Sequence, residues 1–214
     1  MWSNVSAYLP ILMEGVKGTI IVTAGSLALS TVLGLVWALM RVSGIRWLAV
    51  TSEWIINFLR GIPIIVILFY IYFVMPDVGF SFSAMQAGII GLGLAYSSYQ
   101  SENFRAGIEA VDNGQIEAAM SMGMSWSTAM RRVILPQAFR ITLPPYGNTM
   151  IMMLKDSSQA STITVAELAM QGKLLALSTF DNKTVFTLVA IIYLVMCLPL
   201  ILIVKHLEKR GAKK

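Results

Sequence analysis

The sequence predicts an all-α integral membrane protein with five transmembrane helices, the N-terminus outside and the C-terminus inside. Of its 214 residues, 57% are hydrophobic and only 13% are charged, and the mean hydropathy is +0.73. Soluble globular chains carry about 25% charged residues, so this composition excludes an ordinary soluble enzyme. The apolar residues gather in long charge-free runs, and lysines and arginines flank these runs unevenly.

Five charge-free runs measure the candidate spans, because a helix needs roughly 20 apolar residues to cross a bilayer. The runs cover residues 18–40, 61–76, 78–101, 141–154 and 184–204. The second run is short, but it extends backwards through an apolar stretch, with Arg60 reaching to the interface. We therefore expect one domain of residues 1–214, with spans near 18–40, 55–76, 80–101, 139–156 and 184–204.

The positive charges orient these spans. With the N-terminus outside, twelve Lys and Arg residues lie on the inner side and four on the outer side. Inner loops of membrane proteins carry the excess of Lys and Arg, and an odd number of spans agrees with termini on opposite sides. Residues 1–17 lack the basic start and cleavage site of a signal peptide, so we expect the first run to remain as a membrane anchor.

The longest polar segment is the inner loop of residues 102–138, which is too short for an independent domain. A short helix is predicted over residues 115–122. Ser125 is a plausible cap of a second helix that runs through Ile134, and Pro136 is expected to end that helix. Two short helices on the inner membrane face form either a docking platform or a folded connector.

Part of this loop resembles a motif of known proteins. Glu117-Ala118-Ala119, followed by Gly123 and then by a Leu-Pro pair, is similar to the E-A-A-x-x-x-G…I-x-L-P loop in membrane subunits of bacterial ATP-binding-cassette (ABC) importers. In that family the loop forms coupling helices that fit a groove on the ATP-hydrolysing subunit. Paired alanines allow a close approach, and the glycine permits a sharp turn. The resemblance implies that Glu117, Ala118, Ala119 and Gly123 dock the ATPase subunit.

The resemblance covers nearly the whole chain and narrows to permeases for polar amino acids, of the histidine, glutamine and arginine type. The segments that carry it are RGIP (60–63), SENFRAGI (101–108), LPQA (135–138), LPPYGN (143–148) and LKDSS (154–158). They are similar to the family's RGTP, SExxRAGI, LPQA, LPPxxN and LKDTS. Ile62 and Ser157 stand where threonine is usual, and Gln159 where an apolar residue is usual. The resemblance implies the type I permease architecture of ABC importers.

Lys155, Asp156, Ser157 and Ser158 end the short fourth span, and two interpretations are open. They form either a solvated outer loop or a broken helix whose polar groups line a cavity. In the second case an ammonium and a carboxylate could face the two charged ends of an amino acid. Asn148 lies seven residues before Lys155, hence on the same helical face, and contacts either a neighbouring span or the ligand. These five residues are the candidate substrate-binding residues.

No motif predicts catalysis. The chain has no G-x-x-x-x-G-K-[ST], H-E-x-x-H or C-x-x-C motif, and its single His and single Cys cannot complete a catalytic set. We therefore expect no enzyme activity, no metal site and no cofactor in this chain, with ATP and Mg bound by a partner subunit. Cys197 and the fourteen methionines are expected to fill space between helices.

By resemblance, the chain is expected to be the permease subunit of an ATP-driven importer that moves a polar amino acid or a similar solute by alternating access. The expected partners are two ATP-binding cassette subunits, a second permease subunit (identical or related), an extracytoplasmic substrate-binding protein and the lipid of the bacterial inner membrane. No nucleic-acid partner is expected, because the basic residues flank apolar runs. The alternative is an ion-coupled secondary transporter or channel, which would favour inverted halves and charges buried mid-span.

Overall fold

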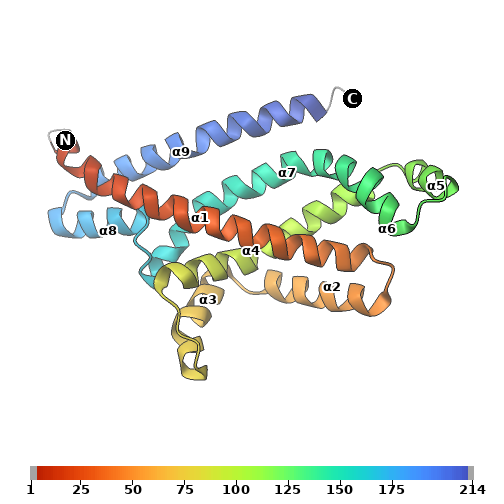
Figure 1. Cartoon of the computed structure of the whole chain (residues 1–214). Coiled ribbons are helices and arrows are strands. Elements are labelled where there is room, and N and C mark those ends of the chain that lie inside the picture. Colours follow the sequence, from red (N-terminus) through yellow and green to blue (C-terminus); the bar gives the residue numbers. More distant parts are fainter. Residues whose placement is uncertain (1–3, 212–214) are drawn as a thin grey trace.

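The computed structural model describes residues 4–211, which are helical and contain no strand (Figure 1). The predicted all-α class is therefore confirmed. The α-helices are α1 (Val5–Val42), α2 (Arg46–Gly61), α3 (Ile64–Phe69), α4 (Ala84–Glu109), α5 (Asn113–Ser121), α6 (Trp126–Ala129), α7 (Leu135–Asp156), α8 (Leu168–Thr179) and α9 (Asn182–Gly211). Shorter turns are the π-helices η1 (Tyr70–Val74) and η3 (Met130–Ile134) and the 3-10 helices η2 (Met75–Val78) and η4 (Ser157–Ile163).

The long helices α1 and α4 run parallel to each other. Gly25 of α1 packs against Ile89, and Gly34, further along α1, packs against Gln100. Because both helices point the same way, the chain between them must return along the bundle. Residues 43–83 make this return through α2 and α3.

The helix α7 runs opposite to α4. Thr142 of α7 packs against Gly107, and Asp156 at the end of α7 meets Tyr96, nearer the start of α4. The last helix, α9, turns back again and runs in the direction of α1 (Figure 1). The two ends of the described chain therefore lie at opposite ends of the bundle.

The range 55–76, expected as one span, is not one straight helix. α2 ends at Gly61, α3 begins at Ile64, and the two are bent by 97°. Pro63 explains the break, because proline lacks an N–H and keeps the preceding residue out of the helical region. Ile62 accordingly adopts an extended conformation with φ −107° and ψ 131°.

Pro136 does not end a helix, and that prediction is wrong. α6, the π-helical turn Met130–Ile134 and α7 follow one another with helical dihedral angles. Pro136 lies in the first turn of α7, where the missing N–H costs least. The wider π-turn before it gives the proline ring room.

Within the described residues, two helices meet the length and hydropathy expected of a membrane span, namely α1 and the Asn182–Lys209 part of α9. Their most apolar windows have mean hydropathies of 2.0 and 2.9. The bent pair Arg46–Gly61 and Ile64–Val78 meets the same requirement only when the two helices are taken together. Polar and proline residues keep α4 and α7 below this requirement.

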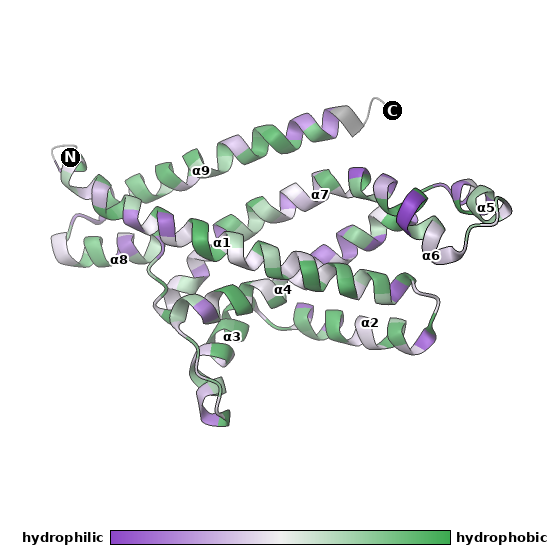
Figure 2. Cartoon of the chain, viewed as in Figure 1, coloured by the Kyte–Doolittle hydropathy of each residue, from purple (hydrophilic) through white to green (hydrophobic). Residues whose placement is uncertain are grey.

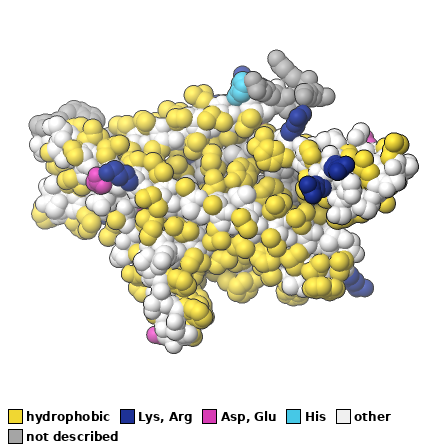
Figure 3. Space-filling model, in the orientation of Figure 1, with side chains coloured by type: hydrophobic (Ala, Val, Ile, Leu, Met, Phe, Trp, Pro, Cys, Tyr) yellow, Lys and Arg dark blue, Asp and Glu magenta, His cyan; other side chains and the backbone are white. Residues whose placement is uncertain are grey.

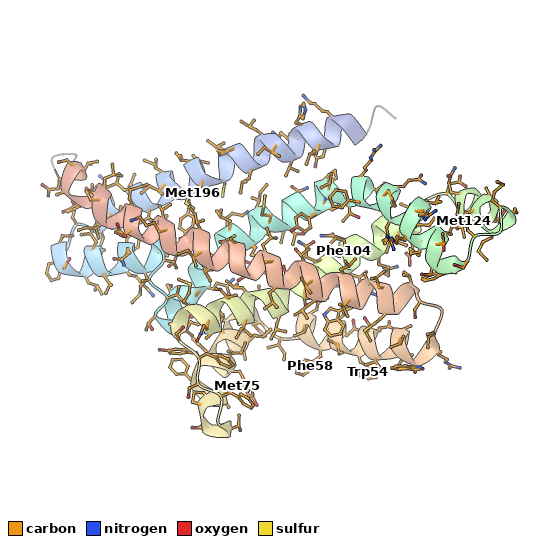
Figure 4. All side chains as sticks on the ribbon, viewed as in Figure 1. Trp54, Phe58, Met75, Phe104, Met124 and Met196 are labelled. Carbon is orange, nitrogen blue, oxygen red and sulfur yellow. The ribbon has the colours of Figure 1, made fainter. Side chains whose placement is uncertain are left out.

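Apolar side chains cover the outside of the bundle. Trp54 and Phe58 project from α2 away from the other helices (Figure 4) and are 73% and 67% exposed. Figure 3 shows hydrophobic side chains over the middle of this face and most charged ones toward its ends. Hydrophilic residues concentrate around α5 and α6 in Figure 2. A surface this apolar is stable in lipid rather than in water, so the bundle is embedded in a membrane.

Candidate functional site

The predicted docking residues lie on α5 and, for Gly123, just after it, at the end of the bundle opposite the N-terminus (Figure 1). Glu117, Ala118 and Gly123 are exposed there, whereas Ala119 is buried. The two alanines therefore have different environments: Ala118 is available to a partner, and Ala119 packs inside the loop.

Gly123 ends α5 in a left-handed conformation with φ 81°. The Met124 N–H donates to the Ala119 carbonyl at 3.1 Å, and the Gly123 N–H donates to the Met120 carbonyl at 2.9 Å. This pair of bonds is the Schellman ending of a helix, which favours glycine because a side chain is strained at positive φ. The turn that joins α5 to α6 therefore depends on Gly123.

Three exposed apolar side chains surround these residues, and the sequence reasoning missed them. Met120 is 48% exposed, Met122 81% and Trp126 46%. They lie in the hydrophilic part of the chain, outside the predicted spans, so lipid does not account for their exposure. Exposed apolar groups clustered in a polar region are typical of a surface that binds another protein.

Two of the five candidate substrate-binding residues share the open face of α7. Asn148 and Lys155 are both exposed, as their seven-residue spacing predicts. Met152 lies between them on the same face and is 48% exposed. The Asn148 amide donates to the Glu208 carboxylate of α9 at 3.4 Å, so it contacts a neighbouring helix.

The other three candidates point elsewhere. Asp156 is half-buried and turns toward α4, where the Tyr96 hydroxyl donates to its Oδ2 at 2.7 Å. Ser157 is fully buried and donates to the Leu154 carbonyl at 2.8 Å. Ser158 is half-buried and donates to the Lys155 carbonyl at 2.8 Å. The five residues therefore do not converge on one point, and Ser157 faces the protein interior.

The end of α7 lies at mid-length of the bundle rather than at its outer edge. Its partner Tyr96 is near the middle of α4, and the 3-10 helix Ser157–Ile163 continues from there. A solvated outer loop does not describe this position. The backbone turn continues in 3-10 form, so the segment offers polar side chains rather than free backbone groups.

α4 contributes further polar groups that the sequence reasoning did not single out. The Asn103 amide donates to Thr149 Oγ1 at 2.9 Å and to the Pro145 carbonyl at 3.5 Å, both on α7. The Arg60 guanidinium lies over the Tyr99 ring, 5.6 Å from its centre. We use the name polar face of α4 and α7 for these groups together with Asn148, Lys155 and Asp156, although they do not converge on one point and Arg60 comes from α2.

The comparisons with known proteins agree with this architecture. Residues 30–213 match the family described as binding-protein-dependent transport system inner membrane components. The chain belongs to this family. Among its relatives is the "Probable amino-acid ABC transporter permease protein YckA" of Bacillus subtilis (strain 168), 39% identical over 203 residues that cover 95% of this chain and 90% of the relative.

A second relative in the same strain is the "Probable glutamine ABC transporter permease protein GlnM", 37% identical over 100% of this chain and 97% of its own length. Among solved structures, an amino acid ABC transporter determined with histidines superposes with a TM-score of 0.90 at 35% identity and covers 98% of each chain. The chain therefore has the fold of an ABC transporter permease over its whole length.

This permease carries an ionic cluster where α1, α2 and α4 meet. Glu102 accepts from Arg41 at 2.6 Å and from Arg105 at 2.8 Å, and Arg60 lies 3.8 Å away. Burial opposes ionisation of Glu102, but hydrogen bonds from Arg105 and Arg41 outweigh it and hold its pKa below the ordinary value. The pair with Arg105 lies within α4, and Arg41 and Arg60 link Glu102 to α1 and α2.

A second carboxylate lies buried where α1, α8 and α9 meet in the permease. Glu167 caps α8 by accepting from the Ala169 N–H at 2.9 Å and the Met170 N–H at 2.7 Å. The Tyr193 hydroxyl of α9 donates to it at 2.7 Å, and Thr19 of α1 lies 3.5 Å away. Glutamate is not among the usual N-cap residues, so no local pattern in the sequence predicts this cap or its distant partners.

Within residues 4–211 there is no group of three or more His, Cys, Asp or Glu side chains that could hold a metal ion. The polar face of α4 and α7 offers hydrogen-bonding and charged groups, which can bind a polar solute.

Proposed function

We propose that this chain is the membrane-spanning permease subunit of an ATP-driven importer of amino acids. The family match over residues 30–213 carries the proposal, together with relatives of nearly the same length whose names are those of amino-acid, glutamine and cystine permeases. A polar amino acid fits the polar face of α4 and α7. An ion-coupled mechanism has no comparable support.

The proposed topology has five crossings, with the N-terminus outside and the C-terminus inside. The parallel course of α1, α4 and α9, with α7 opposite, supports an odd number of passes. Residues 46–78 then form a broken second span, since the chain must return between α1 and α4. The excess of Lys and Arg near α5 and α6 supports an inner location for that end.

The proposed complex contains two ATP-binding subunits, which hold ATP and Mg, and a second permease subunit. The exposed Glu117, Ala118 and Gly123 supply the docking surface for an ATP-binding subunit, helped by Met122 and Trp126. A substrate-binding protein on the outer side of the inner membrane follows from the family's description as binding-protein-dependent.

In the proposed mechanism, closure of the ATP-binding subunits moves α5 and α6, and the spans rock to open the polar face to each side in turn. Asn148, Lys155, Asp156 and Ser158 are the proposed contacts with the solute. Ser157 is left out of this set because it is fully buried, and its hydroxyl supports the turn from inside the protein.

Co-purification from native membranes in mild detergent tests the docking surface. Gly123→Pro cannot adopt φ 81°, so we expect it to lose the ATP-binding subunit that the unaltered chain retains. Gly79→Pro is the matched control, because Gly79 also has positive φ, donates one backbone bond and lies away from α5. Equal retention by both variants would contradict the proposed surface. Uptake that persists without ATP at a constant ion gradient would contradict the importer itself.

A further inference from the structure

Asp156 is a charged side chain with an unusual set of partners. It lies at mid-length of the bundle, and its Oδ2 accepts one hydrogen bond, from the neutral hydroxyl of Tyr96 at 2.7 Å. Among the described side chains, no cationic group comes within 4.0 Å of it, and the adjacent Lys155 is exposed and unpaired with it. A carboxylate at membrane depth without a counter-charge is costly, and such residues commonly mark a ligand or ion pathway.

The second carboxylate oxygen remains available. Oδ1 of Asp156 accepts no hydrogen bond from residues 4–211, yet it is not among the buried atoms that lack a partner. Solvent therefore reaches Oδ1, while Oδ2 is held from inside the protein. The Asp156 carboxylate therefore has one oxygen held by Tyr96 and one oxygen that remains free.

Tyr96 is held more rigidly than a surface tyrosine. Its side chain is 1% exposed and belongs to the apolar cluster that joins α4 to the end of α7. Its ring packs against the Tyr99 ring with centres 5.6 Å apart. Because the ring cannot swing away, the hydroxyl fixes the orientation of the Asp156 carboxylate.

We propose that Tyr96 is a positioning residue for solute binding. It orients Asp156 so that the free Oδ1 accepts the positively charged group of the transported amino acid, either the α-ammonium or a cationic side chain. This inference rests on the proposed function, and it adds a residue and a chemical class of ligand to it. The cation of the solute provides, through a charge-assisted hydrogen bond, the counter-charge that no described side chain supplies within 4.0 Å of Asp156.

The test uses the whole complex in proteoliposomes, with the ATP-binding subunits and the substrate-binding protein. Each of the twenty common L-amino acids is added singly, and solute uptake is measured per ATP hydrolysed. We expect Tyr96→Phe to lower this ratio about tenfold, as befits the loss of a hydrogen bond to a charged group. ATP hydrolysis stimulated by the binding protein should stay within about twofold, because the ring packing is retained.

Three comparisons make this test specific to positioning. Tyr72→Phe is the matched control, because Tyr72 is also packed against an aromatic ring and its hydroxyl makes no hydrogen bond with the described residues. We expect it to behave as the unaltered chain does. In an Asp156→Asn background, Tyr96→Phe should cause no further loss, because the two residues act as a unit. An analogue of the transported amino acid that lacks its cationic group should not be affected by Tyr96→Phe.

The outcomes that overturn the inference are distinct from failure of the proposed function. If the unaltered complex takes up no amino acid, the proposed function fails. If the unaltered complex does take up an amino acid, three results would overturn the role of Tyr96. The first is an unchanged ratio of uptake to ATP hydrolysis in Tyr96→Phe, and the second is full additivity of Tyr96→Phe with Asp156→Asn. The third is a fall in ATP hydrolysis as large as the fall in uptake. If the complex that carries Tyr96→Phe does not assemble, the Asp156→Asn variant alone tests the inference. It keeps a carbonyl acceptor for Tyr96 and removes the charge, so unchanged uptake overturns the inference and selective loss of uptake supports it.

Discussion

Glu167 shows how one buried side chain connects elements that are distant in the sequence. Two backbone N–H groups of α8 and the hydroxyl of Tyr193 donate to its carboxylate. Each of these donors would lose its partner if the carboxylate were removed. A buried donor left unsatisfied costs about 1–3 kcal/mol, which is more than the bond itself contributes.

We expect Glu167→Ala to lower the free energy of unfolding by about 2–4 kcal/mol, since it removes both a helix cap and a buried hydrogen-bond acceptor. Glu167→Gln should cost less, because its amide oxygen still accepts. Chemical unfolding of the purified chain in detergent measures both effects. Glu14→Ala is the control, as Glu14 is 67% exposed and pairs only with exposed Lys17 on the same helix. A change in the free energy of unfolding above about 0.5 kcal/mol in Glu14→Ala would show that the measurement does not report on the buried site alone.

Glu102 makes the stability of the ionic cluster between α1, α2 and α4 depend on pH. Its folded-state pKa lies below the ordinary value because the bonds from Arg105 and Arg41 outweigh burial. A carboxylate of this kind contributes stability above its unfolded pKa, about 4.3, and loses it as pH falls through the lower folded pKa. We expect Glu102→Gln to melt below the unaltered chain at pH 7, with the gap closing under pH 4. A gap that does not change with pH would contradict the ionic origin of the effect.

At the scale of residues, sequence patterns predicted where a residue lies on its helix or turn better than which distant residue it contacts. The glycine at position 123 indicated a sharp turn, because few other residues adopt positive φ. The spacing of Asn148 and Lys155 correctly placed both on one face of α7. The bond between Tyr96 and Asp156 joins residues 60 apart, and no local pattern reports such a contact.

At the scale of helices, proline acts differently at each position. Pro63 separates α2 from α3, whereas Pro136, Pro144 and Pro145 all lie within the continuous helical run that ends at Asp156. The difference arises from the backbone around each ring: the π-turn before Pro136 is wide, and Ile62 before Pro63 is extended. The sequence predicted that Pro136 ends a helix, because no local pattern indicated the π-turn before it.

Close packing of α1 against the segment after α7 gives a prediction at this scale. A side chain at Gly18 would collide with the Ala166 carbonyl, whereas one at Gly61 would meet nothing within 4 Å. We expect Gly18→Ala to destabilise the fold by about 1–3 kcal/mol through overpacking. Gly61→Ala should be neutral or stabilise by up to about 1 kcal/mol, because alanine favours helix. Thermal unfolding of the two variants side by side in detergent compares them. Equal melting temperatures of Gly18→Ala and Gly61→Ala would contradict the close packing of Gly18 against Ala166.

At the scale of the whole molecule, the hydropathy of single helices identifies fewer candidate spans than the five charge-free runs predict. α1 and α9 are apolar enough to be recognised alone, but α2 with α3 passes only as a bent pair. α4 and α7 carry the polar groups that face each other, such as Asn103 and Thr149, and these lower their hydropathy. The same residues that form the candidate site therefore weaken its signal as membrane spans.

Thiol labelling in intact cells tests the proposed topology. The only native cysteine, Cys197, is buried, so the unaltered chain should not react with a membrane-impermeant reagent. Ser81→Cys, in the exposed loop before α4, should be labelled from outside. Ser127→Cys, exposed on α6, should react only after the membrane is opened. Labelling of both from outside would exclude the five-span arrangement.

The buried carboxylate of Glu167 also constrains how the protein is made. Thr19 leaves the ribosome early, Glu167 much later, and Tyr193 only with the final helix. The apolar cluster beside them likewise unites Leu12 of the first helix with Leu188 of the last. During insertion, the N-terminal half of α1 therefore lacks its final neighbours until α9 has been synthesised. A nascent chain halted before α9 has a Glu167 carboxylate without its Tyr193 donor and an α1 helix without its α9 neighbours. Membrane quality control can recognise both features.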